Sequence, residues 1–182
     1  MRGEFINKGK NGNLNQIEPN LKWFVVRTKT LTEKKVALRL TEQSFEVYLP
    51  LYTTLRQWSD RKKKIERPLI SSVVFVRCTT TDLHRIYTVP SVAGILQDNR
   101  KPAVVHAHEI QNLRILLQQA DAVALTPLIL EPGMPIEVIR GPFKGIIGTA
   151  VHELGKLRVL IEIKQLDIAF SVNVPKSFVK MR

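Results

Sequence analysis

The chain has 182 residues, with 28 Lys and Arg against 16 Asp and Glu, so its formal net charge is +12. Apolar residues make up 44% and charged residues 24%, a composition that indicates a folded protein and excludes disorder of the whole chain. The single cysteine, Cys78, excludes an intramolecular disulfide framework and a multi-cysteine zinc site. We therefore expect a reducing, cytoplasmic location. No apolar run approaches the ~20 residues that span a bilayer, and no secretory signal is expected.

The positive charge is concentrated in the middle of the chain. Residues 21–121 carry +8 of the total, whereas residues 1–20 carry +1 and residues 122–182 carry +3. Such an excess of cations predicts a polyanionic partner, with nucleic acid favoured over an acidic membrane. Residues 1–20 are rich in Asn, Lys and Gly without apolar periodicity, so we expect a flexible tail there.

Residues 21–120 are predicted to form one α+β domain, a sheet covered by helices. Apolar and β-branched runs predict strands at 23–27, 45–49, 73–76 and 92–96, and the third of these is expected to be central. Helical spacing and capping signals predict helices from about residue 33 to 44, at 82–88 and at 106–119. Glu33 is expected to close a capping box with Thr30 at the start of the first helix.

A second, all-strand domain is predicted at residues 133–182. Residues 121–132 hold two prolines and no clear period, so they are expected to be a linker. Four β-rich runs follow at 136–140, 145–151, 158–163 and 168–174, separated by turn residues. We expect them to form a small closed barrel, since closure removes exposed sheet edges.

Motifs for catalysis are not found in the sequence, which favours a binding protein over an enzyme. The glycines between Gly141 and Gly148 lack the Gly-Lys-Ser/Thr ending of a phosphate loop, and no helix is predicted after them. His106 and His108 have no third ligand nearby, and Cys78 has no histidine at a spacing that suggests a dyad. We expect no cofactor and no metal.

Residues 56–67 form a basic stretch with a local charge of +4. One interpretation is a solvated loop tip, which is what charge runs usually are. The other is a hairpin tip on nucleic acid, in which cations contact phosphates and a tryptophan stacks on an unpaired base. On the second interpretation the nucleic-acid-binding residues are Arg56, Trp58, Arg61, Lys62, Lys63, Lys64 and Arg67.

Several motifs, in order, resemble the NusG family over residues 21–180. In the first domain they are Lys22-Trp23-Phe24-Val25-Val26, Glu33, Tyr48-Leu49-Pro50, Pro68-Leu69-Ile70, Val73-Val74-Phe75-Val76-Arg77 and the run at residues 89–96. In the second they are Pro132-Gly133-Met134-Pro135-Ile136-Glu137-Val138, Gly141-Pro142-Phe143-Lys144-Gly145 and Gly148, which are similar to a KOW motif. The resemblance implies a NusG-type α/β sandwich with an antiparallel sheet, followed by a KOW β-barrel.

The resemblance also implies a transcription elongation factor that binds the clamp helices of RNA polymerase and recruits further factors through its KOW domain. Carried onto this chain, the polymerase-binding residues are Trp23, Leu69, Ile70, Ser71, Ser72 and Val73. We expect Ile70 and Val73 to mark an exposed apolar patch. The KOW partner-binding residues are Phe143, Lys144, Ile163 and Lys164. Core packing is the alternative interpretation of Trp23 and Val73.

Two departures from the family pattern point to a specialised paralog, similar to the RfaH-like and UpxY-like antiterminators. Ile70-Ser71-Ser72-Val73 replaces Phe-Pro-Gly-Tyr, and Ile163-Lys164-Gln165 replaces the Ile-Phe-Gly loop that contacts Rho and ribosomal protein. The replacement of an apolar anchor by a lysine at residue 164 argues against Rho binding. We expect an antiterminator for particular long operons, such as those for surface polysaccharide, that acts with RNA polymerase and with DNA or nascent RNA. The alternatives are a housekeeping NusG that couples polymerase to Rho or the ribosome, and a ribosome-type KOW protein that binds RNA.

Overall fold

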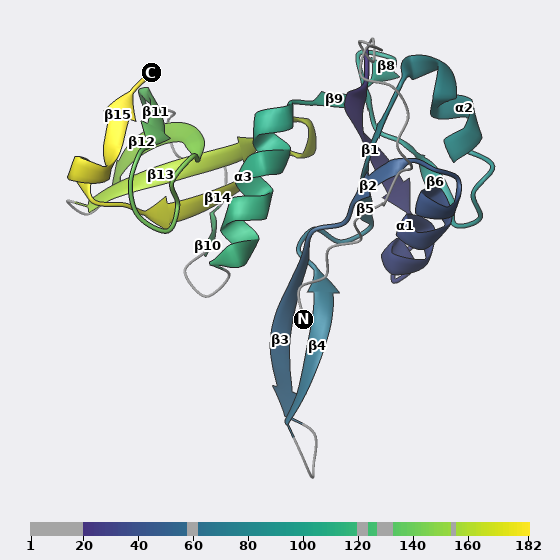
Figure 1. Cartoon of the computed structure of the whole chain (residues 1–182), viewed down its shortest axis with the longest axis horizontal. Coiled ribbons are helices and arrows are strands. Elements are labelled where there is room, and N and C mark those ends of the chain that lie inside the picture. Colours follow the sequence, from purple (N-terminus) through teal and green to yellow (C-terminus); the bar gives the residue numbers. More distant parts are fainter. Residues whose placement is uncertain (1–19, 58–61, 120–123, 127–132, 154–155) are drawn as a thin grey trace, which may run out of the picture. The chain divides into compact units, whose positions relative to one another are not determined.

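The computed structural model describes residues 20–57, 62–119, 124–126, 133–153 and 156–182 (Figure 1). The tail expected at residues 1–20 therefore lies almost wholly outside the described residues. Contacts between Cα atoms divide the chain into two units, Met1–Val104 and Val105–Arg182. This division falls earlier than the boundary expected near residue 120, because helix α3 (Ala107–Gln118) contacts the strands of the second unit.

The first unit is built on an antiparallel sheet with the strand order β2–β5–β1–β6, in which β9 also pairs with β1. The strands are β1 (Lys22–Thr28), β2 (Glu46–Tyr48), β5 (Val73–Cys78), β6 (Val92–Ile95) and β9 (Val104–Val105). The prediction that residues 73–76 form a central strand is confirmed, since β5 lies between β2 and β1 and these four residues are buried. A strand apolar on both faces is stable only where both faces are covered.

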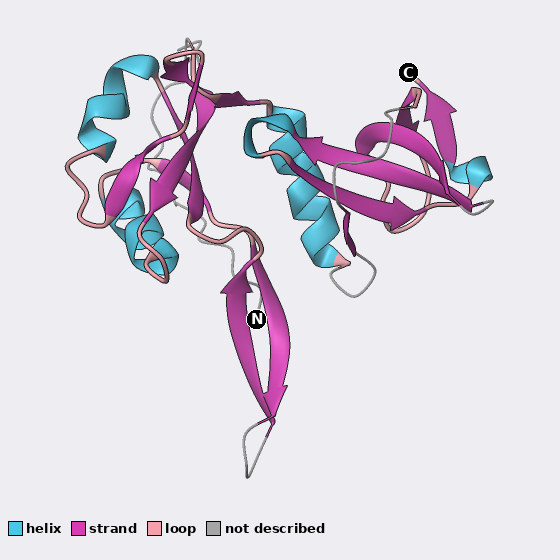
Figure 2. Cartoon of the chain, turned by 180° about the vertical axis from the view of Figure 1, so that it is seen from behind, coloured by secondary structure: helices cyan, strands magenta, loops and turns pink. Residues whose placement is uncertain are grey.

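One face of this sheet is covered by α1 (Glu33–Glu42) and by the short helices η1 (Thr80–Asp82) and α2 (Leu83–Ile86), as Figure 2 shows. Val36, Ala37 and Leu40 are buried, so the predicted apolar side of α1 is confirmed. They pack in a core with strand residues that include Phe24 and Val76. Each fully buried side chain of this kind stabilises the fold by about 1.5–3 kcal/mol.

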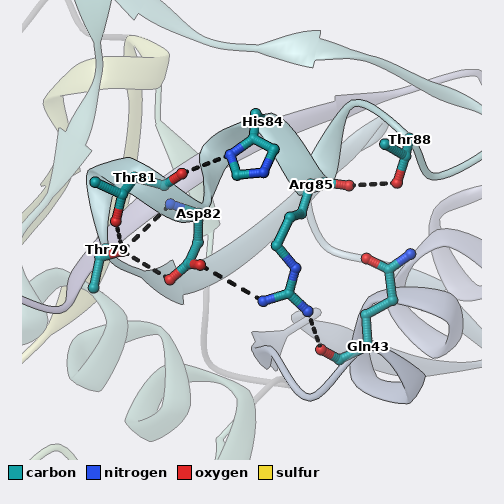
Figure 3. A network of polar contacts seen from close by, with 7 residues as sticks. All are labelled: Gln43, Thr79, Thr81, Asp82, His84, Arg85 and Thr88. Atoms are coloured by element: carbon teal, nitrogen blue, oxygen red, sulfur yellow. Dashed lines mark hydrogen bonds and ion pairs between the residues drawn. The ribbon is translucent and has the colours of Figure 1, made fainter.

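A network of polar contacts joins the end of α1 to η1 and α2 (Figure 3). The Arg85 guanidinium donates a hydrogen bond to the Gln43 carbonyl at 2.9 Å and lies 3.6 Å from the Asp82 carboxylate. The central carbon of the Arg85 guanidinium also lies 4.8 Å from the centroid of the Phe45 ring. The Thr79 hydroxyl donates to Asp82 at 2.7 Å, which holds the pKa of that carboxyl below its usual range. Because Gln43 follows the last residue of α1, Arg85 satisfies a carbonyl that the helix leaves unpaired.

Two hairpins complete the first unit. The longer one pairs β3 (Leu51–Gln57) with β4 (Lys62–Pro68) as a separate two-stranded sheet that projects from the larger sheet (Figure 1). The shorter one pairs β7 (Gln97–Asp98) with β8 (Lys101–Pro102). Asn99 and Arg100 connect the shorter pair with φ values of 49° and 63°. Two positive φ values match the twist of the flanking strands, so these two residues form a tight hairpin turn.

The second unit contains a six-stranded sheet with the order β10–β14–β13–β12–β11–β15. Its strands are β10 (Ala124–Thr126), β11 (Pro135–Val138), β12 (Ile147–Glu153), β13 (Lys156–Ile163), β14 (Ile168–Asn173) and β15 (Val179–Met181), with η3 (Lys164–Leu166) and η4 (Lys176–Phe178) between them. The closed barrel expected from the sequence is not confirmed, because among the described strands the two end strands, β10 and β15, do not pair with each other. Both are only three residues long, which limits the backbone groups left at each edge. β10 lies within the stretch expected to be a linker.

A buried side-chain amide on helix α3 forms hydrogen bonds with the backbone of this sheet. Asn112 is only 2% exposed, and its side chain both donates to the Ile147 carbonyl at 2.7 Å and accepts from the Ile147 N–H at 3.1 Å. Ile147 faces Glu137 on β11, and pairing between β12 and β13 begins two residues later, at Thr149. The Asn112 side chain thus occupies the hydrogen-bonding position that a neighbouring strand would fill.

Replacing Asn112 with Ala should destabilise the second unit by about 2–4 kcal/mol, because two partly buried backbone groups lose their partners. The measurement is hydrogen exchange of the Ile147 amide in the full chain, which should accelerate by at least tenfold. Gln111→Ala is the matched control, since Gln111 is the exposed neighbour on the same helix. An unchanged exchange rate in Asn112→Ala would show that this amide does not hold the helix.

Candidate functional site

The basic stretch predicted to bind nucleic acid lies on the β3–β4 hairpin. Arg56 is on β3, whereas Lys62, Lys63, Lys64 and Arg67 are on β4. Trp58 and Arg61 lie outside the described residues. A hairpin was one of two interpretations of this stretch, but its strands could not be assigned from the sequence, because Arg, Lys, Thr and Glu dominate them and leave no apolar alternation. Their signal was the length of the polar stretch between two apolar segments.

The strand register places one pair of cationic residues opposite each other. Arg56 faces Lys63, and the next paired positions are Gln57 with Lys62 and Leu55 with Lys64. Like charges at opposed positions destabilise a two-stranded sheet, and an isolated hairpin is marginally stable in water. A bound polyanion would relieve this repulsion. An anion-binding role for the hairpin remains a prediction.

The base of the hairpin is anchored to the rest of the first unit. The Lys34 ammonium on α1 lies 3.2 Å from the Glu66 carboxylate on β4, although both side chains are about half exposed, so this pair contributes little stability. The Leu69 N–H donates to the Pro50 carbonyl at 2.8 Å, which closes the hairpin where β3 begins and β4 ends. These contacts fix the point from which the cationic strands project.

The sheet face opposite α1 and α2 has an apolar centre and charged ends. Side chains alternate between the faces of a strand, so the residues opposite the helix-covered core share this second face. The register arranges them in rows: Glu46, Arg77 and Trp23; Tyr48, Phe75 and Val25; Val73 and Arg27. The Tyr48 and Phe75 rings stack with centroids 6.2 Å apart, and Arg77 forms an ion pair with Glu46 at 3.0 Å.

Burial of the predicted polymerase-binding residues differs from the sequence-based expectation. Trp23 and Ile70 are each 6% exposed and Val73 is fully buried, so the expected exposed patch at Ile70 and Val73 is wrong in this structure. The physical reason is that Val73 begins a central strand and Trp23 lies on the strand beside it. Leu69 and Ser72 are half-buried and Ser71 is exposed. Their role in polymerase binding remains a prediction.

The segment between β4 and β5 is held by a residue that the sequence assigned to another role. The Glu33 carboxylate accepts a hydrogen bond from the Ser72 N–H at 2.7 Å. The capping box expected with Thr30 is wrong, because α1 begins at Glu33 itself and Thr32 takes the N-cap position. A box needs the acidic residue three positions after the cap. No local sequence signal links residues 39 positions apart.

The predicted KOW partner-binding residues separate into two kinds. Phe143 and Ile163 are buried in the second unit, whereas Lys144 and Lys164 are exposed. Gly141 and Gly145 flank Phe143 with φ values of +81° and +92°, which favour glycine. A Cβ on Gly141 would also lie 2.8 Å from the Phe178 ring. These glycines explain the Gly-Pro-Phe-Lys-Gly motif as a turn requirement.

Cys78 lies in the core of the first unit, next to the polar network of Figure 3. Burial, together with the nearby Asp82 charge, raises the pKa of the Cys78 thiol to about 11. The thiol is therefore protonated at neutral pH and is a poor nucleophile. Among the described residues, no group of three or more His, Cys, Asp or Glu side chains could hold a metal ion. The described helices include none that is long and apolar enough to cross a membrane.

The first unit combines an antiparallel sheet, helices on one face of it and a projecting hairpin rich in Lys and Arg, and the second unit is β-rich. The family model described as "Transcription termination factor nusG" matches residues 21–114, slightly more than half of the chain. The chain belongs to the NusG family. Factors of this family act in transcription termination and antitermination, and they interact with RNA polymerase and nucleic acids.

Two curated relatives match most of the chain. The transcription termination/antitermination protein NusG of Rickettsia bellii is 25% identical over 172 residues, covering 88% of this chain and 89% of the relative. The NusG protein of Chlamydia pneumoniae is 25% identical over 156 residues, covering 78% of this chain and 85% of the relative. A solved structure described as "Domain interaction in Thermotoga maritima NusG" has a TM-score of 0.45 and 21% identity, covering 89% of this chain and 97% of that chain.

Proposed function

We propose that this NusG-family factor is a specialised antiterminator that promotes processive transcription of particular long operons, such as those for surface polysaccharide. The observation that carries the proposal is the segment of Ile163, Lys164 and Gln165. Ile163 is fully buried and Lys164 is exposed, so the surface offers a cation where the housekeeping pattern has an apolar anchor for Rho. A factor that does not recruit Rho favours read-through over termination.

In this proposal the first unit contacts the clamp helices of RNA polymerase through Trp23, Leu69, Ile70, Ser71, Ser72 and Val73. Of these, Trp23, Ile70 and Val73 are buried, whereas Ser71 is exposed and Leu69 and Ser72 are half-buried and accessible for contact. The cationic hairpin contacts DNA or nascent RNA through Arg56, Trp58, Arg61, Lys62, Lys63, Lys64 and Arg67. Phosphate contacts of this kind hold a protein in register without reading sequence.

The second unit recruits another factor through Phe143, Lys144, Ile163 and Lys164, with a ribosomal protein as the candidate. Of these, Lys144 and Lys164 are exposed and available for direct contact. A housekeeping role remains the second candidate, because both curated relatives carry the general termination/antitermination name over most of their length.

The two candidates are separated by transcription with purified RNA polymerase on a long template that contains a Rho-dependent terminator. We expect the added protein to bind polymerase, to increase full-length transcripts in the presence of Rho, and not to be retained by immobilised Rho. Retention by Rho together with increased termination would contradict the specialised role and support the housekeeping one. Association with ribosomal subunits but not with polymerase would contradict both.

A further inference from the structure

Glu33 is a buried carboxylate that pairs with no cation among the described residues. It is 4% exposed, and among the described residues its side chain accepts a hydrogen bond from the Ser72 N–H at 2.7 Å. Burying an ionised group is costly unless hydrogen bonds compensate it. As the first residue of α1, Glu33 also experiences the favourable field of the helix N-terminus. An exposed carboxylate would gain that field without being buried, so the helix alone does not explain where Glu33 lies.

Ser72, the partner of Glu33, has a strained backbone. Its φ is +58°, in the left-handed region that residues other than glycine rarely adopt. Strain of this kind persists only when surrounding contacts hold the residue in place. Two contacts do so here: Glu33 accepts from the N–H of Ser72, and the Thr28 N–H donates to its carbonyl at 3.0 Å. Both peptide groups beside the Ser72 Cα are thereby fixed.

The fixed residue ends the segment Leu69–Ser72, which connects the cationic hairpin to the central strand β5. The Leu69 N–H is bound to the Pro50 carbonyl at its other end. The segment is therefore held at both ends, while Ser71 between them is exposed and Leu69 is half-buried. A surface segment with fixed backbone loses little conformational freedom when a partner binds it, which raises affinity without adding a contact.

We infer that Glu33 is a positioning residue, which sets the Leu69–Ser72 segment in advance for the partner that docks on it. This inference rests on the proposed function, in which that partner is RNA polymerase. Glu33 itself does not touch the partner. It acts through the left-handed backbone of Ser72, which orients Ser71 and the residues that precede it.

The test compares three variants of the full-length chain. Glu33→Ala removes the acceptor, Glu33→Gln keeps an acceptor oxygen at the same reach without the charge, and Glu42→Ala removes an exposed carboxylate from the same helix as a matched control. Two quantities are measured for each: the hydrogen-exchange rate of the Ser72 amide in the free protein, and the affinity for RNA polymerase.

We expect Glu33→Ala to accelerate Ser72 amide exchange and to weaken polymerase binding, each by at least tenfold. Glu33→Gln and Glu42→Ala should both stay within about threefold of the wild-type affinity. If Glu33→Ala fails to fold, Glu33→Asp replaces it, because its carboxylate is one methylene too short to reach Ser72. The same losses are then expected.

Two results separate failure of this inference from failure of the proposed function. If the wild-type chain does not bind polymerase, the proposed function is wrong, and the Ser72 exchange rate still tests whether Glu33 holds the segment. If the wild type binds polymerase and the variant that lacks the Glu33 contact binds equally well, the positioning role is wrong. Equal loss of affinity in Glu33→Gln and Glu33→Ala would also overturn it, because the hydrogen bond would then not be the cause.

Discussion

Replacing Ile70 with Asp is expected to abolish RNA polymerase binding and to lower the free energy of unfolding of the first unit by about 3–5 kcal/mol. The sequence alone predicts loss of binding in a domain that stays folded. The structure changes this expectation, because Ile70 is 6% exposed and burying a carboxylate in place of its apolar side chain is costly. Thermal unfolding and a polymerase pull-down measure the two effects.

The adjacent residue separates a docking role from a purely structural one. Leu69 is half-buried, so Leu69→Asp should leave the first unit folded, with a loss of about 1 kcal/mol or less. If the segment docks on polymerase, this variant should still bind at least tenfold more weakly than the wild type. A folded Leu69→Asp variant with wild-type affinity would remove the segment from the polymerase-binding site.

Replacing Arg61, Lys62, Lys63 and Lys64 with Ser should weaken nucleic-acid binding by roughly 100- to 1000-fold at physiological salt. If each cation contacts one phosphate, the slope of log K against log salt should become shallower by roughly 2.8–3.6. Folding should be unaffected or slightly improved, because the register then no longer opposes Arg56 with a lysine. Equilibrium binding to single- and double-stranded DNA and RNA over a salt series provides the measurement.

The control removes the same charge from another place. Arg140, Lys176, Lys180 and Arg182 are exposed in the second unit, and their replacement by Ser also removes four cations from the net charge of +12. If this control weakens binding as much as the hairpin variant does, the effect is due to net charge and the hairpin is not the site.

If the Trp58 ring stacks on a base, Trp58→Ala should weaken nucleic-acid binding by about 1–3 kcal/mol, with little change in the slope of log K against log salt.

The predicted elements that the structure confirms are those whose pattern is local. The apolar run at residues 23–27 predicts a buried strand, and the spacing of Val36, Ala37 and Leu40 predicts a helix with one buried side. The structure has β1 and α1 at these residues. In a half-buried helix or a buried strand, the spacing of the apolar residues within the segment itself indicates which side is buried. By the same logic, the turn glycines around Phe143 are visible in sequence because positive φ restricts residue type.

The bounds of the hairpin strands were not assigned from the sequence, and the closed barrel expected for the second unit is not confirmed. β3 and β4 are paired by backbone hydrogen bonds, which every residue except proline can make, so their polar side chains carry no strand period. β10 comprises three residues in a proline-containing stretch and becomes a strand by pairing with β14, more than 40 positions later. Helix α3 shows an apolar side, but its sequence does not say which sheet that side meets.

The candidate site shows the same division. The sequence by itself determined its chemistry: a cationic stretch for phosphates, an apolar segment before a central strand, and a lysine in place of an apolar anchor at residue 164. Tertiary structure alone decided which of these residues are accessible. It buried Trp23, Ile70 and Val73, exposed Lys164, and brought Glu33 to Ser72 across 39 positions. Residue type is a local property, whereas burial and hydrogen-bond partners depend on which distant segments fold together.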